Sequence, residues 1–177
     1  MNNIPKISKK EYPGLYQAAD DASTNAQSNY ITIIGIDLSA MIIAAALAIY
    51  NYQNTESKQL LYIVSALFIL LSLILTIVVL TKKYEDVWYQ GRALAESCKT
   101  LTWRFITCSE LFENNLSEAE ARSKFIERLS DLSKEFTELN KALNSKVASL
   151  PVIPDLLLQL RRLSVSDRKD YYIKNRI

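Results

Sequence analysis

A single carboxylate lies inside a long apolar stretch, and its surroundings decide what chemistry it can do. Asp37 stands within "ITIIGIDLSAMIIAAALAIY", residues 31–50. A carboxylate in hydrocarbon costs several kcal/mol unless it is solvated, paired or protonated, so it marks a water path or a polar contact between helices. Two interpretations are open: a hydrogen-bonded residue in helix packing, or a side chain that lines an aqueous path in an oligomer. Its helical face carries mostly small side chains, at Ile33, Ala40, Met41, Ala44 and Ala48.

Three hydroxyl groups share one helical face of the second apolar stretch, residues 60–80: Ser65, Ser72 and Thr76. Such hydroxyls return hydrogen bonds to their own helix or to a neighbouring helix, and in some proteins they line a pore. Together with Asp37 they are the candidate intramembrane polar residues, either as packing contacts or as the lining of a pore.

The segment "WYQGRALAESCKTLTW", residues 88–103, carries a second group of functional side chains. Its candidate interaction face consists of Trp88, Arg92, Glu96, Lys99 and Trp103. Helical spacing makes Arg92–Glu96 and Glu96–Lys99 ion pairs, and it allows each cation to lie over a tryptophan four positions away. The alternative is an aromatic belt with exposed ion pairs. On a continuous helix Trp103 lies about 35 Å beyond Leu80, too far for a belt, so we expect it to contact another helix or subunit.

The composition excludes several classes of function. The chain has no histidine and a net charge of +2, from 21 basic and 19 acidic residues. It therefore lacks imidazole bases and ligands, and it lacks the broad basic field that nucleic-acid binding needs. No metal cluster, glycine-rich phosphate loop or activated nucleophile is evident, so we predict no catalytic, cofactor or metal site and no enzyme. On one helix Cys98 and Cys108 are about 15 Å apart, so we predict two reduced thiols.

The two apolar stretches predict membrane spans at about residues 31–50 and 60–80, because each can cross a hydrocarbon core about 30 Å thick. About thirty residues precede the first stretch, and no short basic segment lies directly before it. We therefore expect this stretch to be retained rather than cleaved as a signal peptide. Basic residues flank the pair, and the loop between the spans has only Lys58. Both termini are therefore predicted to be cytoplasmic. The flanking cations are Lys6, Lys9, Lys10, Lys82, Lys83, Arg92, Lys99 and Arg104.

The remaining elements are predicted to be helices, since glycine and proline are scarce and no strand-like alternation stands out. One helix is expected from about residue 13 to 50, and the second span is expected to continue unbroken toward Glu113. A turn at "ENNLSEAE" precedes a helix with Ser117 as its N-cap and Glu120 as the capping-box partner. After residue 147, "DLLLQLRRL" predicts a short amphipathic helix and Ser166 begins another. Two apolar seams run along the cytoplasmic helices: Val87, Gly91, Leu94, Cys98, Leu101, Phe105, Cys108 and Phe112 in one, and Phe125, Leu129, Leu132, Phe136, Leu139 and Leu143 in the other.

The predicted fold is all-α: a two-span transmembrane hairpin whose helices extend into a cytoplasmic three-helix, coiled-coil-like bundle. Two spans cannot enclose water alone, and small residues occupy opposite faces of the first span, so we expect a homo-oligomer in the lipid bilayer. The predicted divisions are a cytoplasmic N-terminal helix (1–30), the transmembrane hairpin (31–80), a cytoplasmic helical hairpin (81–146), and a linker with the start of a further helical segment (147–177). The small-residue strips are Ala40, Ala44 and Ala48 on one face and Gly35, Ser39 and Ala46 on the other.

Three motifs resemble those of the SLATT superfamily of two-transmembrane proteins, including its bacterial "domain of unknown function" branch. They are "EYPGLYQAADDAS", the segment from Trp88 to Arg104, and "DRKDYYIKNRI". The resemblance implies a bacterial inner-membrane protein that acts as a pore-forming effector of antiviral defence, with a linked sensor or nucleotide-signalling partner. It places the candidate interaction face on characteristic family positions. Relatives often continue past "YYIKNR", which favours an N-terminal module of a longer protein. The alternative function is a non-conducting membrane scaffold that docks a partner through its cytoplasmic bundle.

Overall fold

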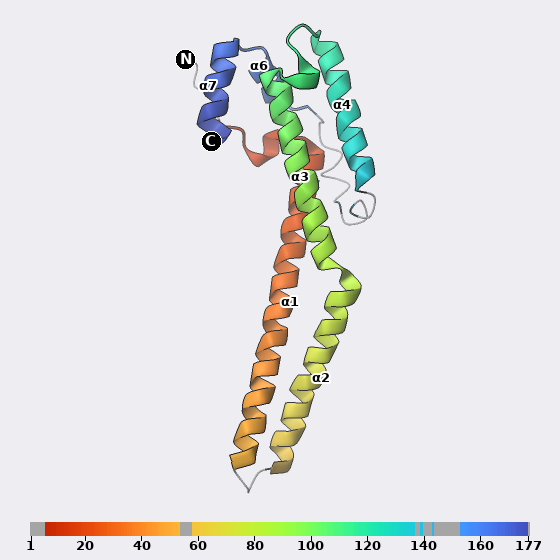
Figure 1. Cartoon of the computed structure of the whole chain (residues 1–177), viewed down its shortest axis with the longest axis vertical. Helices are drawn as coiled ribbons and strands as arrows, with labels where there is room; N and C mark the ends of the chain where they lie inside the picture. The colour runs from red at the N-terminus through yellow and green to blue at the C-terminus, as the bar shows by residue number, and fades with distance from the viewer. Residues whose placement is uncertain (1–5, 54–57, 137–138, 140–142, 144–152, 177) are drawn as a thin grey trace. The chain divides into compact units, whose positions relative to one another are not determined.

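The computed structural model describes residues 6–53, 58–136, 139, 143 and 153–176, and its regular elements there are all helical (Figure 1). The all-α prediction is confirmed. The chain forms two compact units, which we call the bundle unit (Met1–Ser23 with Tyr89–Ile177) and the hairpin unit (Thr24–Trp88). The elements are η1 (Lys9–Glu11), α1 (Gly14–Gln53), α2 (Lys58–Lys82), α3 (Tyr84–Thr107), η2 (Glu110–Phe112), α4 (Glu118–Glu135), α6 (Asp155–Arg161) and α7 (Val165–Arg176).

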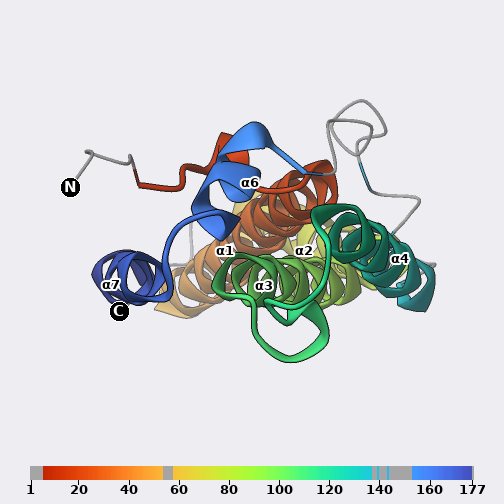
Figure 2. The same cartoon turned by 90° about the horizontal axis from the view of Figure 1, so that it is seen from above.

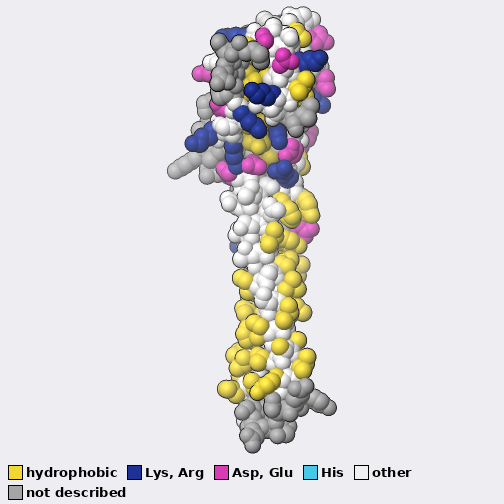
Figure 3. All heavy atoms as spheres, turned by 90° about the vertical axis from the view of Figure 1, so that its left-hand side faces the viewer, with side chains coloured by type: hydrophobic (Ala, Val, Ile, Leu, Met, Phe, Trp, Pro, Cys, Tyr) yellow, Lys and Arg dark blue, Asp and Glu magenta, His cyan; other side chains and the backbone are white. Residues whose placement is uncertain are grey.

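In the hairpin unit, α1 and α2 lie side by side (Figure 1). Ala40 and Ala44 of α1 are 3% and 5% exposed, because their small side chains let α2 approach closely. Large apolar side chains point away from this contact, and Ile42 and Leu80 are 70% and 72% exposed. Figure 3 shows hydrophobic side chains over the hairpin unit and Lys, Arg, Asp and Glu gathered on the bundle unit.

Two helical stretches, Gly14–Tyr50 and Gln59–Phe112, are long and apolar enough to cross a membrane. In the most apolar 18-residue segment of each stretch, only 11% and 6% is buried within the protein. These stretches are therefore not the core helices of a water-soluble fold. The predicted spans at residues 31–50 and 60–80 fall inside these stretches, and one continuous helix covers Gly14–Gln53 as expected.

The prediction of an unbroken helix from Leu80 toward Glu113 is wrong at two points. Lys83 has a φ of 49° and separates α2 from α3, and α3 ends at Thr107, followed by Cys108 with a φ of 54°. Both breaks occur at residues other than glycine, for which a left-handed conformation costs about 1–2 kcal/mol. Neither break is therefore announced by a local sequence signal. At the second break a distant side chain contacts the helix end, since the guanidinium of Arg161 donates to the Phe105 carbonyl at 2.8 Å.

The central residues of the two predicted seams form part of the core of the bundle unit, whereas Val87, Cys108, Leu132 and Phe136 are half-buried. Leu94, Cys98 and Phe105 have no exposed surface, and Phe105 packs on Phe125 of α4 with ring centroids 4.8 Å apart. Figures 1 and 2 both place α3 between α4 and α7. The second seam was expected to stay helical through Leu143, but α4 ends at Glu135, and most of the following stretch lies outside the described residues.

The structure supports two local predictions of helix boundaries and moves a third by one residue. Ser117 caps α4 in a capping box, since its hydroxyl accepts from the Glu120 amide at 3.3 Å and Glu120 accepts from the Ser117 amide at 2.9 Å. The short amphipathic helix is α6. The last helix begins at Val165 rather than Ser166, because the Ser164 hydroxyl accepts from the Asp167 amide and forms the start.

Candidate functional site

The intramembrane carboxylate has a partner on the facing helix. The Ser72 hydroxyl of α2 donates a short hydrogen bond to Oδ1 of Asp37 on α1. Asp37 is half-buried and Ser72 is 9% exposed, so the pair lies at the edge of the contact between the helices. One hydroxyl fills a single acceptor position of a carboxylate, which offers about four. Asp37 thus keeps acceptor capacity within an apolar stretch of α1.

The other two predicted hydroxyl residues of the second span have different surroundings. Ser65 is 8% exposed and donates to the Ala44 carbonyl of α1 at 3.1 Å, the geometry expected of a packing contact between helices. Thr76 is exposed. The structure therefore brings Ser65 and Ser72 against α1 and leaves Thr76 on the outer surface of α2.

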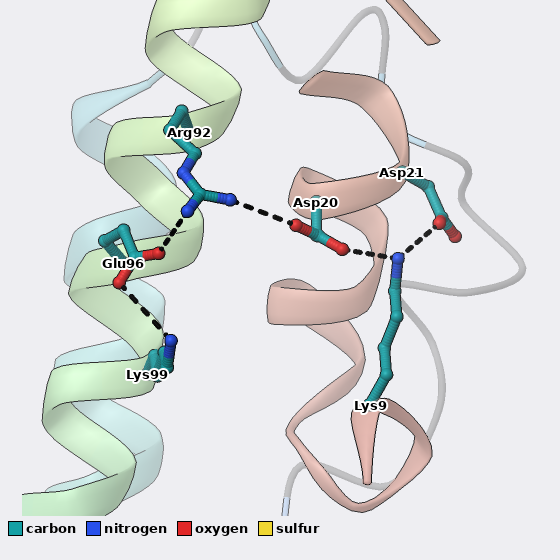
Figure 4. A network of polar contacts seen from close by, with 6 residues as sticks. All are labelled: Lys9, Asp20, Asp21, Arg92, Glu96 and Lys99. Atoms are coloured by element: carbon teal, nitrogen blue, oxygen red, sulfur yellow. Dashed lines mark hydrogen bonds and ion pairs between the residues drawn. The ribbon is translucent and has the colours of Figure 1, made fainter. Parts of the chain in front are cut away.

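The centre of the candidate interaction face forms a chain of ion pairs in the bundle unit (Figure 4). Arg92 approaches Glu96 at 2.9 Å and Lys99 approaches Glu96 at 3.8 Å, as the helical spacing predicts. Arg92 also approaches Asp20 of α1 at 3.7 Å, a contact that the sequence did not suggest. Arg92, Glu96 and Lys99 are 59%, 45% and 36% exposed, and Asp20 is 19% exposed, so the pairs within α3 contribute about 0.2–1 kcal/mol each at most.

The same chain of charges continues to the N-terminal segment. Lys9 of η1 lies 2.5 Å from Asp20 and 2.7 Å from Asp21 (Figure 4). Burial opposes the charged form of Lys9, but the hydrogen bonds and charges of the two aspartates together raise its pKa above the usual value. The network therefore ties η1, α1 and α3 together through alternating charges.

The two tryptophans of the face lie in different surroundings. Trp103 is 3% exposed, and it packs on Tyr171 and Tyr172 of α7 with ring centroids 6.2 and 5.3 Å apart. The helix that we expected against Trp103 is thus supplied by the same chain. Trp88 belongs to the hairpin unit, where its half-buried ring lies 6.3 Å from that of Tyr30. Arg92, Glu96 and Lys99 are the accessible part of the face.

Two buried arginines that sequence reasoning missed hold the end of α3. Arg161 is 9% exposed and donates to the carbonyls of Phe105 and Phe112, and its guanidinium lies 5.0 Å from the centre of the Phe105 ring. Arg168 is 4% exposed and donates to the Cys108 thiol and the Arg161 carbonyl. Both guanidinium groups satisfy carbonyls or a thiol rather than a carboxylate in the part of the chain that the structure describes.

A sequence signal existed for one of these arginines. Arg168, Tyr171 and Tyr172 stand in "DRKDYYIKNRI", one of the three family-like motifs, but the motif gave no indication of what they contact. Arg161 had no signal, because "LLLQLRR" indicated only an amphipathic helix. Asp20 likewise stands in "YQAADDAS", and its partner Arg92 is 72 positions away along the chain.

The described residues contain no group of three or more Cys, Asp or Glu side chains that could hold a metal. Cys98 and Cys108 are free thiols, and burial raises the pKa of Cys98 to about 12, so this thiol is inert at neutral pH. What the arrangement offers chemically is recognition: an intramembrane carboxylate, an exposed chain of charges, and buried cations near the end of α3.

The comparisons with known proteins agree with this arrangement. A search of curated proteins and a search of solved structures found no match to the chain. Residues 13–169, however, match the family described as SMODS and SLOG-associating 2TM effector domain 3. The description is that of a membrane effector domain and not of a catalytic family, and it includes association with SMODS and SLOG signalling modules. The chain, with its two apolar helices, therefore belongs to the SLATT_3 family of two-transmembrane effector domains.

Proposed function

We propose that this protein is the membrane effector of a bacterial antiviral conflict system, and that its copies assemble and form or gate a pore in the inner membrane. Family membership supports the effector role. The observation that supports the pore is Asp37, a carboxylate in the hairpin unit whose one partner among the described residues is the hydroxyl of Ser72. A carboxylate with remaining acceptor capacity is stabilised by water or by donors from neighbouring copies, and a pore supplies both.

The surface of α1 supports association of copies. Gly35 and Ser39 are exposed, and a Cβ built at Gly35 would meet nothing within 4 Å, so the backbone there is open to a neighbouring helix. Ala46 is exposed on the same helix. Two spans cannot surround water, so a water path beside Asp37 requires several hairpins. The role of Ser65, Ser72 and Thr76 as pore lining is part of this proposal, with Ser72 beside Asp37 the strongest of the three.

The orientation is a further part of the proposal. The lysines and arginines that flank the spans favour a cytoplasmic location for both termini and for the bundle unit. The accessible charges of Arg92, Glu96 and Lys99 would then be open to a sensor or nucleotide-signalling partner. Because α1 contributes residues to both units, a change in the bundle unit can be passed to the hairpin unit along one helix.

The test uses the full chain and two readouts. Asp37→Asn and Asp37→Leu are compared with Asp21→Asn, which removes a carboxylate in the bundle unit. We measure dye leakage from liposomes that contain the purified protein, and growth arrest on expression in bacteria. We expect both Asp37 variants to lose leakage and toxicity, while Asp21→Asn keeps them. Undiminished leakage and toxicity in Asp37→Leu would make Asp37 a packing residue and remove the basis for the pore.

The alternative is a non-conducting scaffold that docks a partner, and the accessible chain Arg92, Glu96 and Lys99 is the observation that favours it. A scaffold leaves liposomes sealed in every state. A pore that awaits its signal also leaves them sealed, so toxicity is scored in cells where the signal can form. Sealed liposomes together with toxicity that charge reversal at Glu96 abolishes, but that Asp37→Leu does not, would favour the scaffold.

A further inference from the structure

A cavity of about 440 Å³ lies in the bundle unit between the end of α3 and the start of α7. Three cationic side chains line it: Arg104, Arg168 and Lys169. Arg104 also approaches Glu110 at 3.0 Å, while Lys169 is exposed. The lining residues include no carboxylate, so the walls carry a positive potential.

Arg168 is the cation in the wall that most requires an anion. It is 4% exposed, and its guanidinium donates to the Cys108 thiol, the Arg161 carbonyl at 3.3 Å and the Asn114 amide oxygen at 3.4 Å. None of the three acceptors is a carboxylate, and Nε has no partner among the described residues. A buried cation without an opposite charge is costly, so an anion in the cavity would stabilise this arrangement.

Trp103 of α3 also lines the cavity. Trp103 is 3% exposed, and its indole Nε1 is buried and donates to no acceptor in the part of the chain that is described. Thr100 and Ser109 add hydroxyl groups to the lining, and the half-buried ring of Tyr172 adds a flat apolar surface. Donors therefore outnumber acceptors around the cavity, which suits a ligand rich in anionic oxygen atoms.

We propose that this cavity binds a phosphate-bearing small molecule. Phosphate oxygens accept from guanidinium, ammonium and hydroxyl donors, and such charge-assisted hydrogen bonds are short and strong. The volume lies within the range of about 300–1,000 Å³ typical of small-molecule sites, and the Tyr172 ring can stack on a base. Inorganic phosphate and a mononucleotide share this chemistry. The site is independent of pore formation, so sealed liposomes do not bear on it.

The fluorescence of Trp103, which lines the cavity, can be used to measure ligand binding there. The chain has two tryptophans, so Trp88→Phe leaves Trp103 as the single indole fluorophore. The full-length variant in detergent is titrated at fixed low salt with inorganic phosphate, AMP and adenosine, and calorimetry on the unsubstituted protein repeats each titration. Lys169→Glu reverses a charge in the wall. Lys174→Glu makes the same change on α7 at an exposed position outside the cavity.

We expect AMP to change the Trp103 emission in a saturable manner and adenosine to have no effect at the same concentrations. Lys169→Glu should weaken AMP binding about tenfold, and Lys174→Glu should leave it within about twofold. Tighter binding of AMP than of phosphate identifies a nucleotide as the source, and equal binding identifies free phosphate. Adenosine binding as well as AMP, equal effects of the two lysine variants, or no binding of phosphate and AMP by either method up to about 10 mM would each overturn the proposal.

Discussion

The crossing of α1 and α3 in the bundle unit depends on Gly91, and adding one methyl group there tests it. A Cβ at Gly91 would lie 3.0 Å from the Ala19 carbonyl oxygen, 3.0 Å from the Ser23 Cβ and 3.1 Å from the Ser23 amide nitrogen. Two of these three atoms belong to the backbone of α1, so the helices must move apart by a few tenths of an ångström. Overpacking of this kind costs about 1–3 kcal/mol.

Gly91→Ala also removes the helix penalty of glycine, which is about 1 kcal/mol. Gly35→Ala removes the same penalty, and its Cβ would meet nothing within 4 Å. The difference between the two variants therefore isolates the steric term. We expect Gly91→Ala to unfold about 2 to 12 °C below Gly35→Ala, at about 2–4 °C for each kcal/mol in a chain of this size.

Thermal unfolding of both purified proteins in the same detergent, followed by tryptophan fluorescence, gives this difference directly. Chemical cross-linking at each step confirms that the two variants have the same oligomeric state. If Gly91→Ala unfolded at the temperature of Gly35→Ala or above it, the close approach of α1 and α3 would be refuted. Gly35→Ala is a valid reference when it unfolds no lower than the unsubstituted protein, and a temperature below that of the unsubstituted protein would show that a neighbouring copy packs at Gly35.

Two further predictions concern single side chains of the bundle unit. Ser117→Ala removes the N-cap of α4, and it should lower stability by about 1 kcal/mol, or about 2–4 °C in unfolding temperature, whereas Ser123→Ala at an exposed position in the same helix should not lower it; an unchanged unfolding temperature for Ser117→Ala would contradict the cap. Burial raises the pKa of Cys98 to about 12, so iodoacetamide at pH 8 should modify Cys108 in the folded protein and Cys98 only after denaturation, as peptide mass mapping would show. The Cys98 thiol ionises near pH 9 in the unfolded chain but keeps its proton up to about pH 12 in the folded protein, so its contribution to the free energy of unfolding should decrease as the pH rises from about 9 to 12. Modification of Cys98 before denaturation would refute its burial.

The periodic part of the fold could be predicted from the sequence because burial follows helical spacing. Leu94, Cys98 and Phe105 recur at intervals that place them on one side of α3, and each has no exposed surface. The capping box at Ser117 could be predicted for a similar reason, since both of its hydrogen bonds join residues three positions apart. Predictions of this kind need only the local chain.

The remainder depends on contacts between distant positions, which a single sequence does not reveal. α3 ends where Arg161, 56 positions from Phe105, donates to the Phe105 carbonyl. The partner of Trp103 was predicted as a helix or subunit without an identity, and it proves to be α7 of the same chain. The turn at Lys83 is different again, since its φ of 49° has neither a glycine nor a proline to announce it.

The two units differ in the kind of hydrogen-bond partner that their described residues lack: the hairpin unit lacks donors and the bundle unit lacks acceptors. In both units the partner would come from outside a single chain. In the hairpin unit Asp37 has one hydroxyl donor and keeps acceptor capacity, whereas in the bundle unit Arg168 and Trp103 have donor atoms without acceptors among the described residues. Buried polar groups in proteins are generally paired, so each unit is consistent with an additional component. Donors or water from neighbouring hairpins suit the first, and an oxygen-rich anion suits the second. An effector that assembles its membrane helices and senses a ligand in its helical bundle would satisfy both, with each requirement met by a different binding event.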